Sequence, residues 1–308
     1  MMHSISVVIP ATDGRQTVER CLAALHETLD APEEIILVEE PAGLGPAAAR
    51  NEGARRAAGD LLVFLDSDVV VHRDAFRRIR AAFNADPELS AVFGAYDDDP
   101  LPGGVVSDFR NLLHHHVHHS SAGPATTFWA GLGAIRRDEF LGVGGFDEDR
   151  FSYPSVEDIE LGMRLAARDK RIVLDPAIQG RHLKRWTLGS MVSTDLLRRG
   201  APWVQLLLDG SADSTTLNLG WRHRASAAAS VGCVAALLAR KPKLAGAALA
   251  VMFCLNTDFY ALLYEKRGLR QAAAGVPLHL LHHIVSVVAV PVGVSQHLRG
   301  RARDAGER

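Results

Sequence analysis

The stretch DLLVFLDSD at residues 60–68 decides the fold of the first part of the chain. Its five consecutive apolar residues, 61–65, predict a strand that is buried on both faces, as in a parallel sheet covered by helices. The strand ends directly on two carboxylates, Asp66 and Asp68. Because open α/β sheets bind ligands at the carboxyl ends of their strands, we expect a binding site here.

Apolar runs of strand length alternate with helical patterns on both sides of this stretch. We expect further strands at residues 6–10, 34–39, 91–96 and 171–174. Helices are expected to begin near Gln16, Pro46, Asp74 and Ser155. Proline suits the first helical turn, and serine is a good N-terminal cap. The alternation predicts an α/β domain built on a parallel sheet.

Composition limits the class of protein. A chain of 308 residues has room for one α/β domain of about 200 residues and a smaller appendage. Its formal net charge of −2 argues against an electrostatic grip on nucleic acid. Three widely spaced cysteines exclude a disulfide framework and fit a reducing compartment. The first residues, MMHS, run directly into an apolar strand, so we expect no cleaved signal peptide and a cytoplasmic catalytic part.

The composition changes near residue 220. Apolar stretches at 225–239, 244–263 and 272–298 are separated by clusters of arginine and lysine. A membrane-spanning helix needs about 20 apolar residues, and the second and third stretches contain polar residues. Apolar runs beside basic clusters favour membrane contact through residues 225–298, by spanning or by lying in the interface. A soluble helical subdomain, and hence a soluble cytoplasmic protein, is the alternative. We place the catalytic domain at 1–215 and the hydrophobic helical region at 216–308.

Three groups of residues are candidates for chemistry. Asp66 and Asp68 provide hard oxygen ligands that suit Mg²⁺ or Mn²⁺ bridging a diphosphate. Alternatively, they only turn the chain and cap the next helix. Glu157 and Asp158 open a helix, where one carboxylate either removes a proton from an acceptor hydroxyl or merely complements the helix dipole.

The third group is the run HLKRW at residues 182–186. His182 can complete a metal shell, Arg185 can clamp a diphosphate, and Trp186 can stack on a sugar ring. The alternative is a basic surface turn above a packed tryptophan. Trp129 and Gly131 form a candidate acceptor floor, since an aromatic face suits a sugar and glycine permits close approach; here the alternative is a buried strand with core aromatics.

Five histidines fall within residues 114–119. On a helix, 114/118 and 115/119 would be i, i+4 pairs with a spacing that can hold zinc. No carboxylate stands at an offset that would complete a catalytic site. We favour imidazoles that line a helix beside the acceptor cleft or pack there.

The order of these motifs resembles that of the family 2 glycosyltransferases, which have a GT-A fold with a mixed sheet flanked by helices. The matching segments are VVIP (7–10), GPAAARNEG (45–53), FLDSD (64–68), GGFDE (144–148), EDIEL (157–161) and HLKRW (182–186). The resemblance covers about residues 4–190. No single segment is specific, but the combination is.

The resemblance implies an inverting, metal-dependent transfer from a nucleotide-sugar, with a UDP-sugar favoured, to a hydroxyl acceptor. The hydrophobic C-terminal stretches alone suggest that this acceptor is lipid-linked or membrane-proximal. Mn²⁺ or Mg²⁺ would be the cofactor, with Asp68 as the main ligand, Asp66 near ribose and metal, and His182 beside them. Asp158, next to Glu157, would be the catalytic base. The donor would be bound by Pro10, Ala11, Glu39, Arg50, Asn51, Asp66 and Ser67.

Two departures from the family pattern leave questions open. The family usually has V-D-D-x-S after the second strand, whereas residues 38–41 are VEEP, which leaves the nucleobase undetermined. His182 replaces the usual Gln, so it is an acceptor contact or a metal ligand. A sugar nucleotidyltransferase would need a glycine-rich basic loop where residues 10–15 are PATDGR. A GT-A-like partner protein without turnover is the other alternative.

Overall fold

The computed structural model describes residues 3–12, 17–39, 41, 43–101, 103–210 and 220–306. Residues 13–16, where a helix was expected to begin, and Glu40 of the nucleobase segment lie outside the described residues. The chain forms two compact units. Unit 1 comprises Met1–Pro102 and His118–Lys184, and unit 2 comprises Gly103–Val117 and Arg185–Arg308. The sequence predicts a boundary at 215/216. In the structure, the second unit instead begins at Arg185 and also includes Gly103–Val117, which contains the start of one mid-chain helix.

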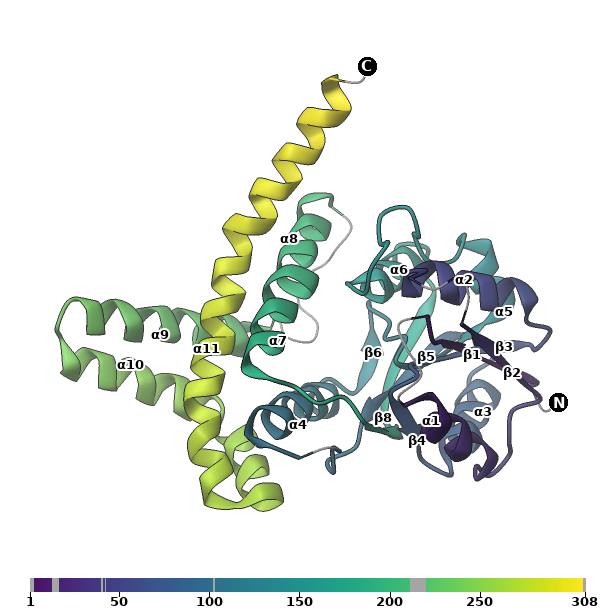
Figure 1. Cartoon of the computed structure of the whole chain (residues 1–308), viewed down its shortest axis with the longest axis horizontal. Helices are drawn as coiled ribbons and strands as arrows, with labels where there is room; N and C mark the ends of the chain where they lie inside the picture. The colour runs from purple at the N-terminus through teal and green to yellow at the C-terminus, as the bar shows by residue number, and fades with distance from the viewer. Residues whose placement is uncertain are drawn as a thin grey trace. The chain divides into compact units, whose positions relative to one another are not determined.

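Unit 1 is built on a mixed sheet in the order β2-β1-β3-β7-β5-β8-β4, with β6 paired to β8 (Figure 1). The strands are β1 (Ile5–Pro10), β2 (Glu34–Val38), β3 (Leu61–Leu65), β4 (Val69–Val71), β5 (Leu89–Tyr96), β6 (Gly123–Ala125), β7 (Leu132–Arg136) and β8 (Arg171–His182). β1 runs parallel to β2 and β3, while β7 runs antiparallel to β3 and β5. The strands expected at residues 6–10, 34–39, 60–65 and 91–96 are therefore confirmed.

Helices accompany the strands of unit 1. They are α1 (Val18–His26), α2 (Pro46–Arg56), α3 (Ala75–Ala85), α5 (Arg137–Gly142) and α6 (Glu157–Ala166). Every side chain of β3 is buried, as its apolar run requires. The core on one face of the sheet packs Phe76, Ile79 and Phe83 of α3 against the strands. A cluster of phenylalanine rings surrounds Phe64, with Phe140 and Phe146 at 5.0 and 5.1 Å between ring centroids.

Two sequence-based boundaries in unit 1 are wrong. The helix expected to be capped by Ser155 begins at Glu157, one residue later than that cap implies, with Val156 at the cap position and no side-chain cap. The strand expected to end at Leu174 continues to His182, because β8 resumes its pairing with β5 after an irregularity: Leu174 pairs with Phe93, and Gln179 with Ala95. Gly94 permits this, since a Cβ there would lie 2.1 Å from the Ile178 carbonyl oxygen.

The strand directions bring the predicted residues to one edge of the sheet. The carboxyl ends of β1, β2 and β3 share this edge because these strands are parallel. β5 and β8 run in the same direction, so Tyr96 and His182 end there as well. β7 begins at this edge, since Leu132 pairs with Leu65. The edge therefore carries the residues that follow β1, β2 and β3, the ends of β5 and β8, and the loop before β7.

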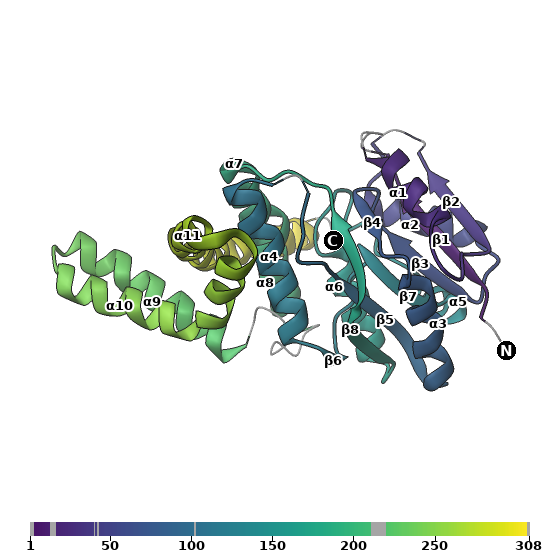
Figure 2. The ribbon, with the colours of Figure 1, turned by 90° about the horizontal axis from the view of Figure 1, so that it is seen from below.

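Unit 2 is helical. It contains the first part of α4 (Val105–Ser120), then α7 (Leu188–Ser193), a π-helix (Thr194–Gly200), α8 (Ala201–Leu208), α9 (Trp221–Leu238), α10 (Pro242–Leu255) and α11 (Thr257–Gly306). Figures 1 and 2 show α9 and α10 as a hairpin of two adjacent helices. In the core of unit 2, Phe109 and Leu112 of α4 pack against Met252 of α10 and against Phe259 and Leu263 of α11.

The C-terminal apolar stretches form helices whose ends differ from those of the apolar runs. The second stretch is interrupted at Asn256, between α10 and α11, and Gly268 breaks α11 with φ 78° and ψ −179°. Within the described residues one helix, Thr257–Ala302, is long and apolar enough to cross a membrane, with a mean hydropathy of 1.7 and one third of that window buried (33%). By length and composition alone this is weak support for a membrane anchor.

Candidate active site

Asp66 and Asp68 leave the end of β3 in a tight turn. The backbone N–H of Val69 donates to the Asp66 carbonyl at 3.0 Å, and the Asp66 N–H donates to the Gly131 carbonyl at 3.1 Å. The side chains of Asp66 and Asp68 remain 31% and 28% exposed, although the strand before them is fully buried. Both carboxylates, with Ser67 between them, are thus available to a ligand at the sheet edge.

His182 joins Asp68 at this edge. Its Nε2 lies 3.3 Å from Asp68 Oδ2, and the Leu183 N–H donates to the Asp68 carbonyl at 2.8 Å. Tyr96 stacks on the imidazole with 4.2 Å between ring centroids and 11° between the planes. Burial disfavours the charged Asp68, but the hydrogen bond and charge of His182, with Lys184 nearby, lower the pKa of this carboxyl. Asp68 is therefore ionised at neutral pH.

Arg50 of α2 ties two acidic groups together. Its Nη2 donates to Asp66 Oδ1 at 2.7 Å and its Nη1 donates to Glu157 Oε1 at 2.8 Å. The Arg50 side chain is only 6% exposed, and that of Glu157 only 5%. Both were expected to face ligands, the former as a donor contact and the latter beside the base. In the structure they form a buried ion-pair network that links α2, the end of β3 and the start of α6.

Asp158 is held by the backbone. The Ala130 N–H donates to its Oδ2 at 3.2 Å, and the Ile159 N–H donates to its Oδ1 at 2.8 Å. Burial, followed by the charge of Glu157, raises the pKa of Asp158 to about 7, against the opposing effect of Arg50 and the two backbone hydrogen bonds. A carboxyl group with this pKa exchanges protons readily near neutral pH, which suits a general base.

The residues at this edge fit a divalent cation that is shared with a diphosphate. Among the described residues, no three Asp, Glu, His or Cys side chains already form a metal-binding group. Asp68 and His182 are paired, however, and Asp66 keeps one oxygen beyond its contact with Arg50. Mg²⁺ in enzymes is commonly held by one or two carboxylates together with substrate phosphates. Asp68, Asp66 and His182 fit that donor set, with the imidazole favouring Mn²⁺.

The loop before β7 carries Trp129 and Gly131. The Trp129 ring is half-buried and meets Tyr96 and His118 edge-on, at 4.9 and 5.3 Å between centroids. A Cβ on Gly131 would lie 2.4 Å from Trp129 Cζ2. Glycine is thus required here by the indole of the same chain. Since Ala130 between them donates to Asp158, the loop lies directly beside the candidate base.

The remaining predicted donor residues divide into two groups. Pro10 ends β1, and Ala11 and Glu39 follow β1 and β2 at the site edge. The Ala11 N–H donates to the Val38 carbonyl at 2.8 Å. Asn51 has a different position. Its side-chain amide donates to the Phe146 carbonyl at 2.8 Å and accepts a hydrogen bond from the Phe146 N–H at 2.9 Å. The same amide also donates to Glu148 at 2.9 Å. It therefore fixes the GGFDE loop.

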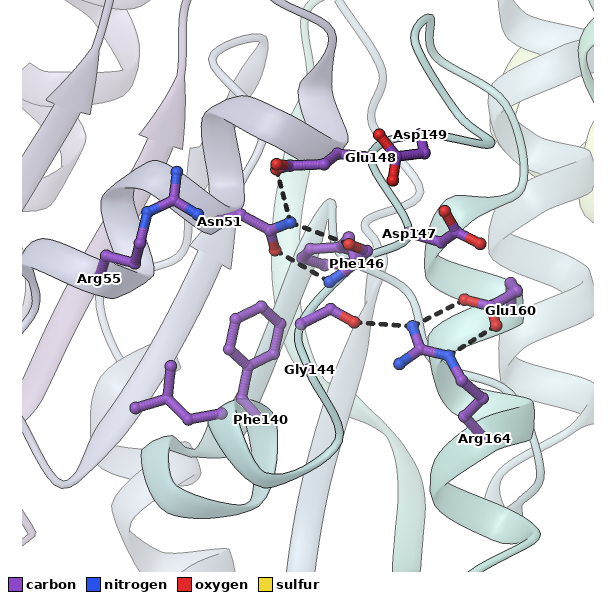
Figure 3. Close-up of a pocket in the computed structure, with 12 residues that line it drawn as sticks. Asn51, Arg55, Phe140, Gly144, Phe146, Asp147, Glu148, Asp149, Glu160 and Arg164 are labelled. Carbon is purple, nitrogen blue, oxygen red and sulfur yellow. Dashed lines mark hydrogen bonds and ion pairs between the residues drawn. The ribbon is translucent and has the colours of Figure 1, made fainter.

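That loop borders a pocket of about 580 Å³ (Figure 3). Asn51, Arg55, Phe140 and Phe146 line it together with Asp147, Glu148, Asp149 and the Glu160–Arg164 pair. Asp66, Asp68 and Asp158 do not line it. The Arg164 guanidinium is occupied by Glu160 and by the carbonyls of Val143 and Gly145. The pocket is therefore distinct from the carboxylate site. Asn51, which follows Arg50 in α2, lines the pocket, whereas none of the three carboxylates does.

Arg185 and Trp186 belong to unit 2. Arg185 is exposed, whereas Trp186 is 5% exposed and lies in the unit's core. The backbone N–H of Trp186 donates to Ser107 Oγ at 2.8 Å, and the Arg110 guanidinium lies 5.6 Å from the centroid of the Trp186 ring. The indole face is covered by protein, which favours the packed-tryptophan alternative over stacking on a sugar.

The histidine cluster of residues 114–119 is helical, as the i, i+4 spacing required, but its members have separate partners. His118 Nδ1 donates to the Gly94 carbonyl at 2.9 Å, and His119 contacts Gln179 at 3.3 Å. His116 lies against Phe259 at 5.5 Å between centroids. These contacts support the packing interpretation. Sequence reasoning missed Tyr96, which had only its place at the end of a strand as a signal.

Part of the chain is similar in sequence to known glycosyltransferases. The sequence model of the family described as "Glycosyl transferase family 2" matches residues 30–141. Validoxylamine A glucosyltransferase of Streptomyces hygroscopicus subsp. limoneus is 28% identical over 224 residues, covering 53% of this chain and 48% of that protein. Pre-mycofactocin glycosyltransferase of Mycobacterium tuberculosis is 27% identical over 221 residues, covering 62% and 45%. The chain thus spans about half the length of these relatives.

A solved structure shows the same fold. The mannosyltransferase from Pyrobaculum calidifontis, in complex with GDP-Man and Mn²⁺, superposes with a TM-score of 0.53 at 18% sequence identity, covering 94% of this chain and 87% of that chain. Residues 30–141 therefore resemble glycosyltransferase family 2, and the mixed sheet of the chain has a GT-A fold.

Proposed function

We propose that the chain is an inverting, metal-dependent glycosyltransferase that moves a sugar from a nucleotide-sugar to a hydroxyl acceptor. One observation carries the proposal. Asp158, whose burial raises its pKa to about 7, lies at the same sheet edge as the ionised Asp68 and its partner His182. A base poised near neutral pH beside a ligand set for a diphosphate is what a single displacement at an anomeric carbon requires.

The roles of the residues follow from their positions. Asp68, Asp66 and His182 would hold a divalent cation, which when bound neutralises the charge that develops on the diphosphate. Asp158 accepts the proton of the acceptor hydroxyl as its oxygen forms a bond to the anomeric carbon. The bond from that carbon to the diphosphate breaks, and the nucleoside diphosphate leaves. The N–H groups of Ala130 and Ile159 hold the Asp158 carboxylate in place throughout.

Two features bear on the acceptor. Trp129 stands beside Asp158 through the Ala130 hydrogen bond, and its half-buried ring offers a platform for a sugar. In unit 2, exposed Leu237, Leu238 and Leu244 lie next to exposed Arg240, Lys241 and Lys243 at the α9–α10 turn. Apolar side chains flanked by basic ones favour a membrane surface. We therefore propose a lipid-linked or membrane-proximal acceptor at the cytoplasmic face.

Nucleotide-sugar binding tests the donor site. UDP-, GDP-, CMP- and dTDP-sugars are titrated onto the full chain with and without Mn²⁺, and onto Asp68→Asn. We expect metal-dependent binding of one nucleotide class, with UDP-sugars favoured, and its loss in Asp68→Asn. Binding of none of them would overturn the donor-site assignment. Asp138→Asn is the control, because this exposed residue follows the opposite end of β7.

Transfer tests the base. Asp158→Asn should retain donor binding and lose turnover by about 10²–10⁴-fold, the usual contribution of a general base. Turnover close to wild type in Asp158→Asn would exclude it as the base. Donor binding without transfer to any acceptor in the wild type would favour a partner protein that has lost turnover. Flotation of the full chain with anionic vesicles tests the membrane proposal, and a chain that stays with the soluble fraction would refute it.

A further inference from the structure

The long apolar helix α11 is packed inside unit 2. Its residues Thr257–Ala302 are long and apolar enough to cross a membrane. However, Phe259 is fully buried beside Phe109 of α4, with 5.6 Å between the ring centroids. A Cβ at Gly293 would lie 2.6 Å from the Ala201 carbonyl oxygen of α8. The protein itself therefore covers much of the apolar surface of this helix.

Polar contacts also fix α11 in unit 2. His282 Nδ1 lies 2.9 Å from Oδ2 of the buried Asp195, and Arg110 of α4 donates to Oδ1 of the same carboxylate at 2.8 Å. His279 Nδ1 lies 3.1 Å from the Tyr260 hydroxyl. Transfer of α11 into hydrocarbon would separate these partners or carry a buried ion pair with them, and both are unfavourable. We therefore expect α11 to remain in the protein core.

The helices α9 and α10 are apolar as well, but their large side chains are exposed. The exposed apolar side chains of this hairpin include Val231, Leu237, Leu238, Leu244, Val251 and Phe253. The buried residues of α9 are small and include Ser230, whose Oγ lies 3.2 Å from Met252 Sγ of α10. A protein in water rarely leaves this much apolar surface uncovered, so the hairpin is an interaction site.

The charges of the hairpin are all basic. Residues 221–257 contain no Asp or Glu. The basic residues divide between the start of α9 and the turn between the helices: Arg222, Arg224, Arg240, Lys241 and Lys243. The three residues of the turn are exposed, and so is Trp221 at the start of α9 (71%). Basic residues and an exposed tryptophan at the ends of apolar helices complement the phosphates and the interface of an anionic membrane.

A hollow opens on the same hairpin. It has a volume of about 320 Å³ and is lined, on α10 and α11, by Gly246, Leu249, Ala250, Phe253, Cys254 and Val276. Because none of these side chains is charged, the hollow favours an apolar ligand. A lipid acyl chain has this chemistry, and a membrane around the hairpin would supply it.

We propose that the α9–α10 hairpin, and not α11, inserts into an anionic lipid membrane. Its exposed apolar side chains enter the hydrocarbon, and Arg240, Lys241 and Lys243 bind lipid phosphates. Lipid is the partner because an all-basic hairpin with apolar sides matches a phosphate layer above hydrocarbon. The proposal rests on the membrane-proximal part of the proposed function and is independent of the transfer reaction.

Flotation separates the two helical elements. The full chain is mixed with vesicles of phosphatidylcholine and phosphatidylglycerol, and binding is measured for wild type and for folded Val251→Glu and Val290→Glu. The two valines are matched, since they are 52% and 48% exposed on α10 and α11. We expect Val251→Glu to weaken binding about tenfold or more, because a carboxylate is costly in hydrocarbon, and Val290→Glu to bind as wild type does. The reverse result, or equal effects of the two changes, would overturn the proposal.

The basic turn has its own test. Arg240→Gln combined with Lys241→Gln should weaken binding to these vesicles roughly 30-fold, at about fivefold for each charge lost near the surface. Arg299→Gln combined with Arg301→Gln, near the end of α11, is the matched control and should change binding little. Equal binding of wild type to vesicles with and without phosphatidylglycerol would exclude an anionic surface as the partner.

Cys254 reports directly on the environment of the hairpin. It is exposed, whereas Cys21 and Cys233 are buried. A water-soluble maleimide should therefore label Cys254 in the free chain, and bound vesicles should protect it. Unchanged labelling in the vesicle-bound chain would overturn the proposal. Protection without lipid, together with a dimer in sedimentation, would do so as well, because a second copy of the chain would then cover the hairpin.

The outcome is separable from that for the proposed function. Nucleotide-sugar binding without vesicles should be the same in wild type and in Val251→Glu. Wild type that binds the donor but does not float would overturn the hairpin proposal and leave the donor site intact. Wild type that floats through the hairpin but binds no donor would overturn only the donor-site assignment.

Discussion

Replacement of Arg50 by methionine measures how much the buried ion-pair network contributes to the stability of unit 1. Methionine keeps most of the side-chain volume and the contact with Phe146, over whose ring the guanidinium lies at 5.5 Å. It removes the partner of Glu157, whose side chain is 5% exposed, and of Asp66. Removing one partner of a buried pair costs about 3–5 kcal/mol, because the other charge stays buried and uncompensated. For a unit of this size, that corresponds to a fall in Tm of about 6–20 °C.

The same helix offers a control. Arg55 is 57% exposed and pairs with Glu52, which is 41% exposed. An exposed pair contributes about 0–1 kcal/mol, so Arg55→Met should change Tm by little. Thermal and urea unfolding of the full-length variants, followed by circular dichroism, measure the difference. Adding Glu157→Gln to Arg50→Met should recover part of the loss, since the double variant no longer buries an unpaired charge.

Equal unfolding midpoints for Arg50→Met and Arg55→Met would refute this reasoning. A double variant less stable than Arg50→Met alone would also do so, because it would show that Glu157 stabilises unit 1 without its partner. Either result would mean that the pairing of Arg50 with Glu157 does not stabilise unit 1.

Two further predictions concern the site. The raised pKa of Asp158, about 7 against 3.8 in an unfolded chain, predicts that transfer falls about tenfold per pH unit below pH 7, as the base becomes protonated. The same shift predicts the opposite trend for stability: the folded state holds this proton more tightly, so the stabilising contribution is complete below about pH 4 and is lost as the pH rises through 7. Gly131→Ala should displace the Trp129 ring, since the new Cβ would lie 2.4 Å from Cζ2, and should destabilise unit 1 by about 1–3 kcal/mol and reduce transfer.

Each of these predictions has a direct check. Rate profiles over pH 5–9 for donor hydrolysis and transfer, with unfolding measured over pH 3–8, are compared between wild type and Asp158→Asn. An unchanged pH dependence of stability in Asp158→Asn would contradict the raised pKa. Gly142→Ala is the control for Gly131→Ala, because a Cβ at Gly142 meets no atom within 4 Å. Equal effects of the two changes would exclude the Trp129 contact as the cause.

The local signals in the sequence were enough to predict the sheet edge. The apolar run 61–65 and the carboxylates after it identify β3 and the residues at its end, because burial and turn chemistry act over a few residues. The role of Arg50 was not predictable in this way, since its partner Glu157 lies 107 residues further along the chain. The continuation of β8 past Pro176 was missed for the same reason, because pairing with β5 outweighs the local break.

The division of α4 has a consequence for biosynthesis. Unit 2 takes Gly103–Val117 from the middle of the chain, yet Phe109 and Leu112 find their packing partners only at Met252 and Phe259. A ribosome that adds about 5–20 residues per second needs roughly 7–30 s to supply those partners. During that interval the apolar face of α4 lacks these partners, while β6, β7 and β8 of unit 1 are still being synthesised. A chain that ended after β8 would leave the apolar face of α4 without the packing partners that it has in the full-length protein.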